Sequence, residues 1–580
     1  MARADYLSEY SRGVIYIIKI TLDKCQESFG VAPCTATGVQ CYNTFSTCKD
    51  TPNYNRGTTD IYLSSISKRI PFAGCRPLLL NNPSIFQTDI SDNKLKTLRF
   101  TFDLAEDFKD YDIGMDPYRS SRATKPDTVP FVKTLLARNP NWQNRPITIY
   151  EGFDGQTQTQ LLDDENIIAY GILKNIRLGD KSIQFEATDI ISPLSEIDYP
   201  EKKGVTLVSD ISTSQTSIVL SDVDGYEDYT ALSIGEEIIT YDTGNISAAN
   251  NMITSCVRAA GGTTAAAHSS GDSAEPCGYF QGDIFDVLKD DILIGAGGLV
   301  SGNIASDWNT IRDNPTEIFE IEAYLPKSTK LNKYIQELID LFCLKMWQGE
   351  DQKIHITRSH QNLNGRTYHI LTDNANIVVD SRASDLNDDD RITTVEIRYD
   401  FDWFGSIDKA EDFSGFEIQH DSDAAGINGA QKIKKKIIPC RWLRRGVYQE
   451  ELFFDFIEAL ARRTLFKYNE AHAFIEAKVE IKDSAITAGD FAKLTTTALV
   501  DETGTPLEAE KFEICKRKPD KNVLSIKMLR CIKTPFLIIA PDSVTNDWST
   551  ATDSEKEYGA ICNDNGEMSD GAPGSVIYAG

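Results

Sequence analysis

The stretch Cys25–Cys48 reads CQESFGVAPCTATGVQCYNTFSTC and places four cysteines in one short segment. The apolar run VIYIIKI, residues 14–20, precedes it and is typical of a buried strand. Glycine, proline and asparagine lie between the cysteines, and these residues favour turns over a long helix. A loop of this kind can curl until its four sulfurs face one centre, which is what a zinc ion or an iron–sulfur cluster requires.

The spacing of these cysteines narrows the choice of chemistry. Cys25, Cys34, Cys41 and Cys48 are separated by eight, six and six residues, and no Cys-x-x-Cys pair occurs among them. This disfavours a zinc ribbon and leaves an iron–sulfur cluster, disulfides or free thiols as the alternatives. Small cysteine-dense segments are often disulfide frameworks, but a chain of this length does not need such cross-links. The spacing alone does not decide among the three.

Length and charge set the broad class. A chain of 580 residues is too long for one hydrophobic core, and its length suggests about three to five domains. Its formal net charge of -27 argues against broad binding of nucleic acid, because a phosphate backbone would be repelled. No apolar run is long enough to span a bilayer, and the N-terminal residues MARADYLSEYSRG contain no signal region. We therefore expect a globular protein made in the cytosol, where its twelve cysteines stay mostly reduced.

Strand patterns recur in the first third of the chain. Leu98–Leu104 alternates apolar and polar residues, as a strand with one buried face does. Residues 132–136 indicate a short helix that ends near Asn139, where a proline follows. Further strands are expected at 146–150, 167–172 and 182–187.

Residues 201–281 read as an inserted all-β module, with strands expected at 217–220 and 237–241. The run CVRAAGGTTAAAH, Cys256–His268, contains a glycine pair but lacks the Lys-Ser/Thr of a phosphate-binding P-loop. His268 could act as a ligand or a base, but a lone histidine among alanine and serine is more often structural.

The second half of the chain mixes helices and strands. Apolar side chains recur at helical spacing over residues 331–342, the strongest amphipathic pattern in the sequence, and indicate a helix that faces the core. Further helices are expected at 284–292 and 453–465, and further strands at 353–357, 394–399, 473–481, 511–514 and 523–527.

Against this background the cysteine segment carries a family resemblance. The run APCTATGVQCYNTFSTCKDTPNY, with FAGCRP downstream, resembles hub-type proteins of long-tailed bacteriophages and of gene transfer agents. The gaps of eight and six are similar to those of the cysteine pairs in the minor tail protein L of lambda-like phages. In that family four cysteines hold a [4Fe–4S] cluster, so the resemblance implies Cys25, Cys34, Cys41 and Cys48 as its ligands. The middle gap is shorter here, and the segment lies near the N-terminus rather than the C-terminal end.

The resemblance also implies an architecture. The strands TIYEG, YGILKNI and IQFEATDI resemble the small β-barrel of phage hub proteins, and residues 488–526 resemble the second barrel. The run at 256–268 is similar to a module that recurs in tail proteins. We expect a mainly β, multidomain protein with α+β parts. Its expected units are a cysteine-rich iron–sulfur segment (1–95), a first hub β-barrel (96–200), the inserted all-β module (201–281), an α+β hub domain (282–440), a second hub β-barrel with a helix (441–545) and a flexible tail (546–580).

The function that the resemblance implies is structural. Hub proteins form a trimeric ring around the tail lumen, so a homotrimer is expected, in contact with the distal tail protein, the C-terminus of the tape measure protein and a tail fibre or receptor-binding tip protein. The genome DNA would contact the ring only while passing through its lumen. The protein itself is not expected to insert stably into a membrane. The protein would be assembled in the host cytoplasm and would reside at the tail tip of the virion.

Catalysis is not expected from the sequence. It contains no Gly-x-Ser-x-Gly elbow, no His-Glu-x-x-His and no P-loop. The alternative function is an iron–sulfur enzyme or electron carrier, which predicts a pocket for a substrate or a second cofactor and a monomer that transfers electrons.

Overall fold

The computed structural model describes most of the first 531 residues. The described ranges are 13–65, 70–86, 89–91, 94–95, 97–105, 130–180, 182–306, 308, 320–358, 367–373, 375–387, 391–421, 434–447, 450–468, 472–483, 485–500, 503–520 and 523–531. The expected tail, 546–580, lies outside them. No helix within these ranges has both the length and the apolar character needed to cross a bilayer.

The first unit is a mixed β-barrel. One sheet has the strand order β3-β2-β1-β6-β7-β8-β5-β4, and a β3–β5 pairing at Leu79 and Leu104 closes seven of its strands into a barrel. Its strands are β1 (Val14–Cys25), β2 (Arg56–Ser65), β3 (Cys75–Leu79), β4 (Ser84–Phe86), β5 (Arg99–Ala105), β6 (Pro146–Phe153), β7 (Ile167–Leu178) and β8 (Ser182–Thr188). The short helix α2 (Phe131–Arg138) packs Phe131 and Leu135 into the barrel core.

The strand β1 lies inside this sheet, paired with β2 on one side and β6 on the other. Its apolar residues face both ways: Ile18 and Ile20 enter the main barrel core, whereas Ile15 and Ile17 join a smaller cluster. A strand apolar on both faces has to be covered on both. Both edges of β1 are paired within the chain, and residues 1–95 and 96–200 are not separate units, because one sheet runs through both.

The inserted module has a core of its own, built from residues between Val205 and Ala274. Its strands are short: β10 (Ile218–Val219), β11 (Ala231–Ile234), β12 (Glu237–Thr240), β13 (Ile246–Ser247) and β14 (Met252–Ile253). Strand β15 (Ala274–Asp283) joins the module to the next unit, because its first half pairs with β11 and its second half with β16.

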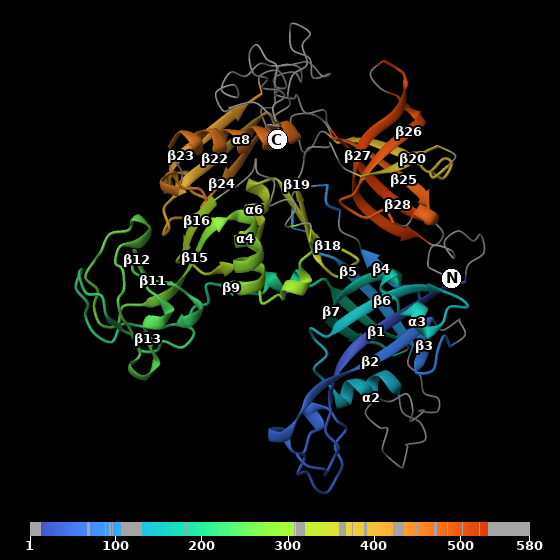
Figure 1. The fold of residues 1–580 in the computed structure, drawn as a ribbon, viewed down its shortest axis with the longest axis horizontal. Coiled ribbons are helices and arrows are strands. Elements are labelled where there is room, and N and C mark those ends of the chain that lie inside the picture. Colours follow the sequence, from blue (N-terminus) through green and yellow to red (C-terminus); the bar gives the residue numbers. More distant parts are fainter. Residues whose placement is uncertain are drawn as a thin grey trace, which may run out of the picture.

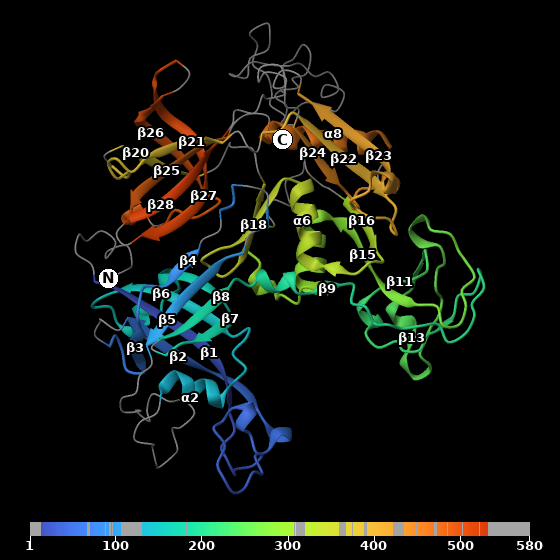
Figure 2. The same ribbon diagram turned by 180° about the vertical axis from the view of Figure 1, so that it is seen from behind.

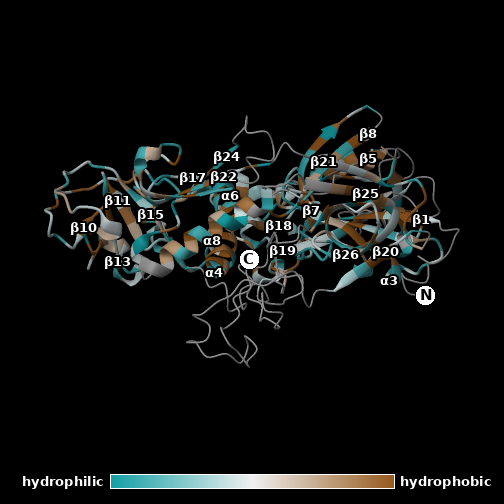
Figure 3. Cartoon of the chain, turned by 90° about the horizontal axis from the view of Figure 1, so that it is seen from above, coloured by the Kyte–Doolittle hydropathy of each residue, from teal (hydrophilic) through white to brown (hydrophobic). Residues whose placement is uncertain are grey.

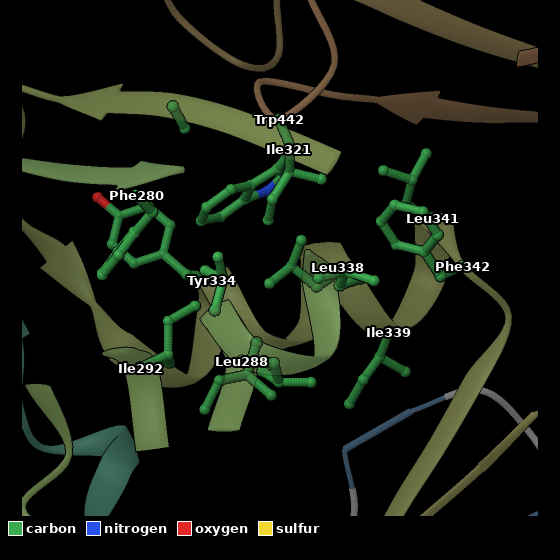
Figure 4. Close-up of a cluster of buried hydrophobic side chains, with 14 of the residues drawn as sticks. Phe280, Leu288, Ile292, Ile321, Tyr334, Leu338, Ile339, Leu341, Phe342 and Trp442 are labelled. Atoms are coloured by element: carbon green, nitrogen blue, oxygen red, sulfur yellow. The ribbon is translucent and has the colours of Figure 1, made fainter. Parts of the chain in front are cut away.

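The central α+β unit contains the largest core of the molecule. Helix α6 (Leu331–Leu341) buries one face there, as its sequence pattern predicted. Figure 4 shows its side chains packed among those of neighbouring elements, including Leu288, Ile292 and Trp442. The remaining elements are β9 (Asp198–Tyr199), α4 (Ile284–Asp286) with a π-helical continuation (Val287–Ala296), β16 (Glu320–Leu325), β17 (Thr329–Lys330), β18 (Leu344–Gln348), β19 (Ile354–Arg358), β22 (Thr394–Phe401), β23 (Phe413–His420), β24 (Lys435–Pro439) and α8 (Glu450–Tyr468).

Helix α8 belongs to this central unit rather than to the second barrel with which its sequence position grouped it. Phe453, Ile457 and Leu460 lie in the same core as α6, and α8 covers the sheet of β22 and β23. The reason is that its apolar face matches the buried face of β22, where Tyr399 meets Phe453 at a ring separation of 5.2 Å.

The second β unit is a six-stranded sheet of order β20-β26-β27-β28-β25-β21, with its own core. In the described residues this sheet is open between β20 and β21. These two strands precede residue 441, so the expected boundary at 441 does not hold: the chain enters this unit, returns to the central unit for β22 to α8, and enters again at β25. The strands are β20 (Tyr368–Thr372), β21 (Ala383–Asn387), β25 (His472–Glu480), β26 (Phe491–Val500), β27 (Pro506–Asp520) and β28 (Val523–Arg530).

Figures 1 and 2 show the four units side by side, with the central unit between the inserted module and the two β units. Seen from above, hydrophobic and hydrophilic residues are intermingled at both ends of the molecule (Figure 3). Polar contacts join the units at their seams. Gln348 accepts a hydrogen bond from the backbone N–H of Ile190 at 2.9 Å and donates one to the carbonyl of Tyr170 at 2.8 Å.

The second β unit is attached to the central unit through a buried ion pair. The ammonium of Lys345 on β18 lies 2.5 Å from a carboxylate oxygen of Glu513 on β27, and both side chains are almost wholly buried. The backbone N–H of Ile90 also donates to the carbonyl of Cys515, at 2.9 Å.

We expect Glu513→Gln to lower the free energy of unfolding by about 3–5 kcal/mol, because the Lys345 ammonium would stay buried without its carboxylate. Chemical denaturation followed by tryptophan fluorescence measures the change. The double variant Lys345→Met with Glu513→Leu is the control and should lose much less. Equal stability of the single variant and the unaltered protein would contradict the assigned role of the pair.

Candidate functional site

The four predicted ligands lie on the loop that joins β1 to β2. Cys25 ends β1, where it pairs with Arg56 at the start of β2. Figure 1 shows the loop extending away from the barrel beside α2. Two short 3-10 turns, Phe45–Thr47 and Thr51–Asn53, supply most of its regular structure, so the turn character read from the sequence is confirmed.

The base of the loop is anchored on α2. Thr44 is fully buried, and its hydroxyl donates to the carbonyl of Arg138 at 2.6 Å. The Arg138 guanidinium in turn lies 4.3 Å from the ring centroid of Tyr42. The backbone N–H of Cys25 donates to the carbonyl of Asn43 at 2.7 Å, which draws the first cysteine toward the same region.

Asp50 braces the far side of the loop. One of its carboxylate oxygens accepts from the backbone N–H of Thr35 at 2.7 Å, and Asn53 donates its side-chain amide to the same group at 3.1 Å. These bonds, led by the one from Thr35, lower the pKa of Asp50. Asp50 thereby ties the segment around Cys34 to the segment around Cys48.

The four sulfurs share one neighbourhood. Cys41 is buried, and Cys25, Cys34 and Cys48 are half-buried. Burial is the main cause that raises the pKa of the Cys48 thiol, and the charges of the other three thiols raise it further. The backbone N–H of Asp50, 3.4 Å from the Cys48 sulfur, acts in the opposite direction. All four are free thiols, and so is every other cysteine that the structure describes.

The spacing of the four sulfurs bears on whether they could hold a single ion or a larger cluster. Over the described ranges, no three His, Cys, Asp or Glu side chains are grouped tightly enough to hold one metal ion. A zinc ion needs its sulfurs at about 2.3 Å from one point, whereas a cluster core is larger and spreads its thiolates. Four cysteines are the number of thiolate ligands that a [4Fe–4S] cluster takes, and an N–H directed at a sulfur, as from Asp50 to Cys48, is a contact that tunes the reduction potential of such a cluster.

The other candidate from the sequence, His268, has a structural partner. Its Nε2 lies 2.8 Å from a carboxylate oxygen of Glu237, which is fully buried on β12. Arg258 pairs with the same carboxylate through two bonds of 2.7 Å. The backbone N–H groups of Ala259 and Ala266 donate to it at 3.1 and 3.0 Å. Glu237 therefore fixes both ends of the run 258–268, and the structural interpretation of His268 is the better one.

Sequence reasoning missed the residues that support these sites. Thr44 and Asp50 hold the cysteine loop, and Glu237 holds the run 258–268 of the inserted module, here called the module loop. Each of the three is an ordinary residue type in a polar segment. A weak signal existed for Asp50, since aspartate two residues before a turn proline often accepts local backbone bonds. Glu237 gave no signal, because it lies in a strand and its partners come more than twenty residues later.

Comparison with known proteins gives structural likenesses only: no family model and no curated protein matches the sequence. The 43 kDa tail protein of prophage MuSo2 from Shewanella oneidensis is 12% identical, with 76% of this chain and 92% of that chain covered and a TM-score of 0.33. A tail protein from Neisseria meningitidis MC58 is 9% identical, with 77% and 91% covered and a TM-score of 0.34. A chain of a native gene transfer agent particle is 10% identical, with 49% and 65% covered and a TM-score of 0.28.

The Glu237 carboxylate should make the module sensitive to acid. Hydrogen bonds from Arg258, Ala266 and His268 outweigh its burial and lower the pKa of Glu237 from 4.5 to about 2. A depressed pKa in the folded state gives stability that is present above pH 4.5 and is lost as the pH falls toward 2. Glu237→Gln should therefore unfold at a lower temperature than the unaltered protein at pH 7, and this difference in unfolding temperature should become smaller as the pH is lowered. Thermal unfolding at several pH values measures this difference, with Glu236→Gln, a change at an exposed residue, as the control. A difference that stays constant with pH would contradict the assigned role of Glu237.

Proposed function

We propose that this chain is a structural hub protein of a phage tail tip and works by assembly rather than catalysis. The observation that carries the proposal is a cysteine-bearing loop suspended from a closed seven-stranded barrel. The sequence resemblance to phage and gene transfer agent hubs implied both parts. A second β unit lies beside the first, as expected for a hub.

The proposed assembly is a homotrimeric ring around the tail lumen, located at the tip of the virion tail and built in the host cytoplasm. A formal charge of -27 per chain suits such a ring, because acidic walls repel a DNA backbone and let it slide past. The proposed neighbours are the distal tail protein, the C-terminus of the tape measure protein and a tail fibre or receptor-binding tip protein.

We further propose that Cys25, Cys34, Cys41 and Cys48 hold a [4Fe–4S] cluster. When bound, the cluster would supply cross-linking between four points of the loop and, in principle, one-electron chemistry. The loop has almost no apolar core: Val31 and Val39 are exposed, and the packing at its base rests on Thr44 and Tyr42. Ligation would therefore stabilise the fold of the loop, as metal binding does in small metal domains.

Purification without oxygen should yield a brown protein with about four iron and four sulfide per chain. Each of Cys25→Ser, Cys34→Ser, Cys41→Ser and Cys48→Ser should lose most of that iron, because each removes one thiolate ligand. Cys75→Ala is the matched control, since Cys75 is buried in the barrel and away from the loop. Retention of full iron content in two or more of the serine variants would remove the cluster from the proposal.

The assembly itself is tested by mass. Light scattering of the purified chain should give a three-chain particle, and electron microscopy should show a ring with a central opening. Detection of the chain in purified virions by mass spectrometry would place it in the tail. A monomer that transfers electrons to an acceptor would instead support the alternative, an iron–sulfur enzyme or electron carrier.

A further inference from the structure

A polar cavity lies where the inserted module meets the central unit, away from the cysteine loop. Its volume is about 810 Å³, within the range of about 300–1,000 Å³ usual for ligand sites. The module contributes Glu236 and residues 261–264, and the central unit contributes residues 400–404 and Arg444. Junctions between domains are a common location for ligand sites.

Both walls of the cavity are fixed before any ligand arrives. The indole N–H of Trp403 donates to the carbonyl of Gly261 at 2.8 Å and so joins the two units across the cavity floor. On the central side, the Lys327 ammonium donates to the carbonyl of Gly405 at 2.7 Å. On the module side, Glu237 holds the run that carries Gly261. A preformed site loses little ordering entropy on binding.

The Arg444 side chain is the unusual feature of this cavity. Its guanidinium lies 4.5 Å from the ring centroid of Trp403. Among the described residues no carboxylate pairs with it; its Nη1 has no hydrogen-bond partner but is sealed from solvent, so a ligand would reach the guanidinium through its other nitrogens. The neighbouring Arg445, by contrast, is paired with Asp400. A partly buried cation without an anion is costly, and a carboxylate bound to Arg444 would offset that cost through charge-assisted hydrogen bonds.

The other lining groups define the rest of the ligand. Glu236 and Asp402 offer carboxylate acceptors, and Thr264 and Ser414 offer hydroxyls that donate and accept. A lining this polar disfavours an apolar ligand. A ligand with several carboxylates would be repelled by Glu236 and Asp402. The expected ligand therefore has one carboxylate, which binds Arg444, and neutral hydroxyl groups, which bind the remaining polar side chains.

We propose that this cavity binds an acidic saccharide, with the carboxylate of a uronic acid on Arg444 and its hydroxyl groups on Glu236, Thr264 and Asp402. The site goes beyond the tail-tip function and does not depend on it. It gives the inserted module a task that neither the barrel nor the cysteine loop performs.

Titration calorimetry with the full chain tests the site, and the probe is the hyaluronan disaccharide, glucuronic acid joined to N-acetylglucosamine, which carries a single carboxylate. Saturable binding is expected. Arg444→Gln should weaken it at least tenfold, the effect of losing about 1.5–3 kcal/mol from a charged hydrogen bond. Thr264→Trp should block it, because Thr264 is exposed on the cavity wall. Arg177→Gln removes an exposed arginine from the distant barrel strand β7 and should leave binding unchanged.

Two further ligands make the result decisive. N,N′-diacetylchitobiose, a neutral disaccharide of the same size, should bind at least tenfold more weakly than the acidic probe, and an acidic tetrapeptide should not bind. Equal affinity for the neutral and acidic saccharides would overturn the role of Arg444. Binding of the peptide in place of the saccharide, no saturable binding of either saccharide, or full affinity in Thr264→Trp would overturn the site. Thermal unfolding of each variant confirms that it folds.

Discussion

The structure depends on the need to cover β1 on both faces. An apolar strand cannot leave either side to water without losing about 25 cal/mol for each Å² of apolar surface left exposed. The chain meets this need by closing the sheet through β3 and β5, so that Ile18 and Ile20 face a filled interior, and by packing Ile15 and Ile17 on the other face in a cluster with Phe72 and Leu161. Everything that follows β1, including the cysteine loop, is positioned by that closure.

The cysteine loop and the module loop solve one problem in two ways. Each is a run of small and polar residues that cannot bury an apolar core. The module loop is held by a single buried carboxylate, Glu237, which receives bonds from both ends of the run. The cysteine loop has Asp50 for one side and Thr44 for its base, and its four thiols lie near enough for the charges of three of them to raise the pKa of Cys48. The proposed cluster would cross-link the cysteine loop, as the Glu237 carboxylate cross-links the module loop.

Local periodicity predicted the elements well, and it predicted their grouping poorly. The helix at 331–341 and the barrel strands β1, β5, β6, β7 and β8 appear where the pattern of apolar residues placed them, whereas β3 and β4 were not predicted. The predicted domain boundary near residue 95 does not hold, because strands that pair in a sheet can lie far apart in the sequence. The sequence of β1 does not indicate that β6 is its partner. The same holds for α8: its sequence shows an apolar face but does not show that this face packs on β22. The four cysteines were found because a rare residue type marks them, whereas Glu237, Trp403 and Arg444 become notable only once distant segments meet.

The chain passes back and forth between the central unit and the second β unit, and this limits how the two units can move relative to each other. After β19 it crosses to form β20 and β21, crosses back to build β22 through α8, and crosses once more for β25 to β28. Three peptide connections therefore run between the same two bodies. One covalent link would permit swivelling, whereas three links constrain rotation of one body about the other, so any relative motion should be a shallow bend. A protease that cuts a single crossing would nick the chain without releasing either body.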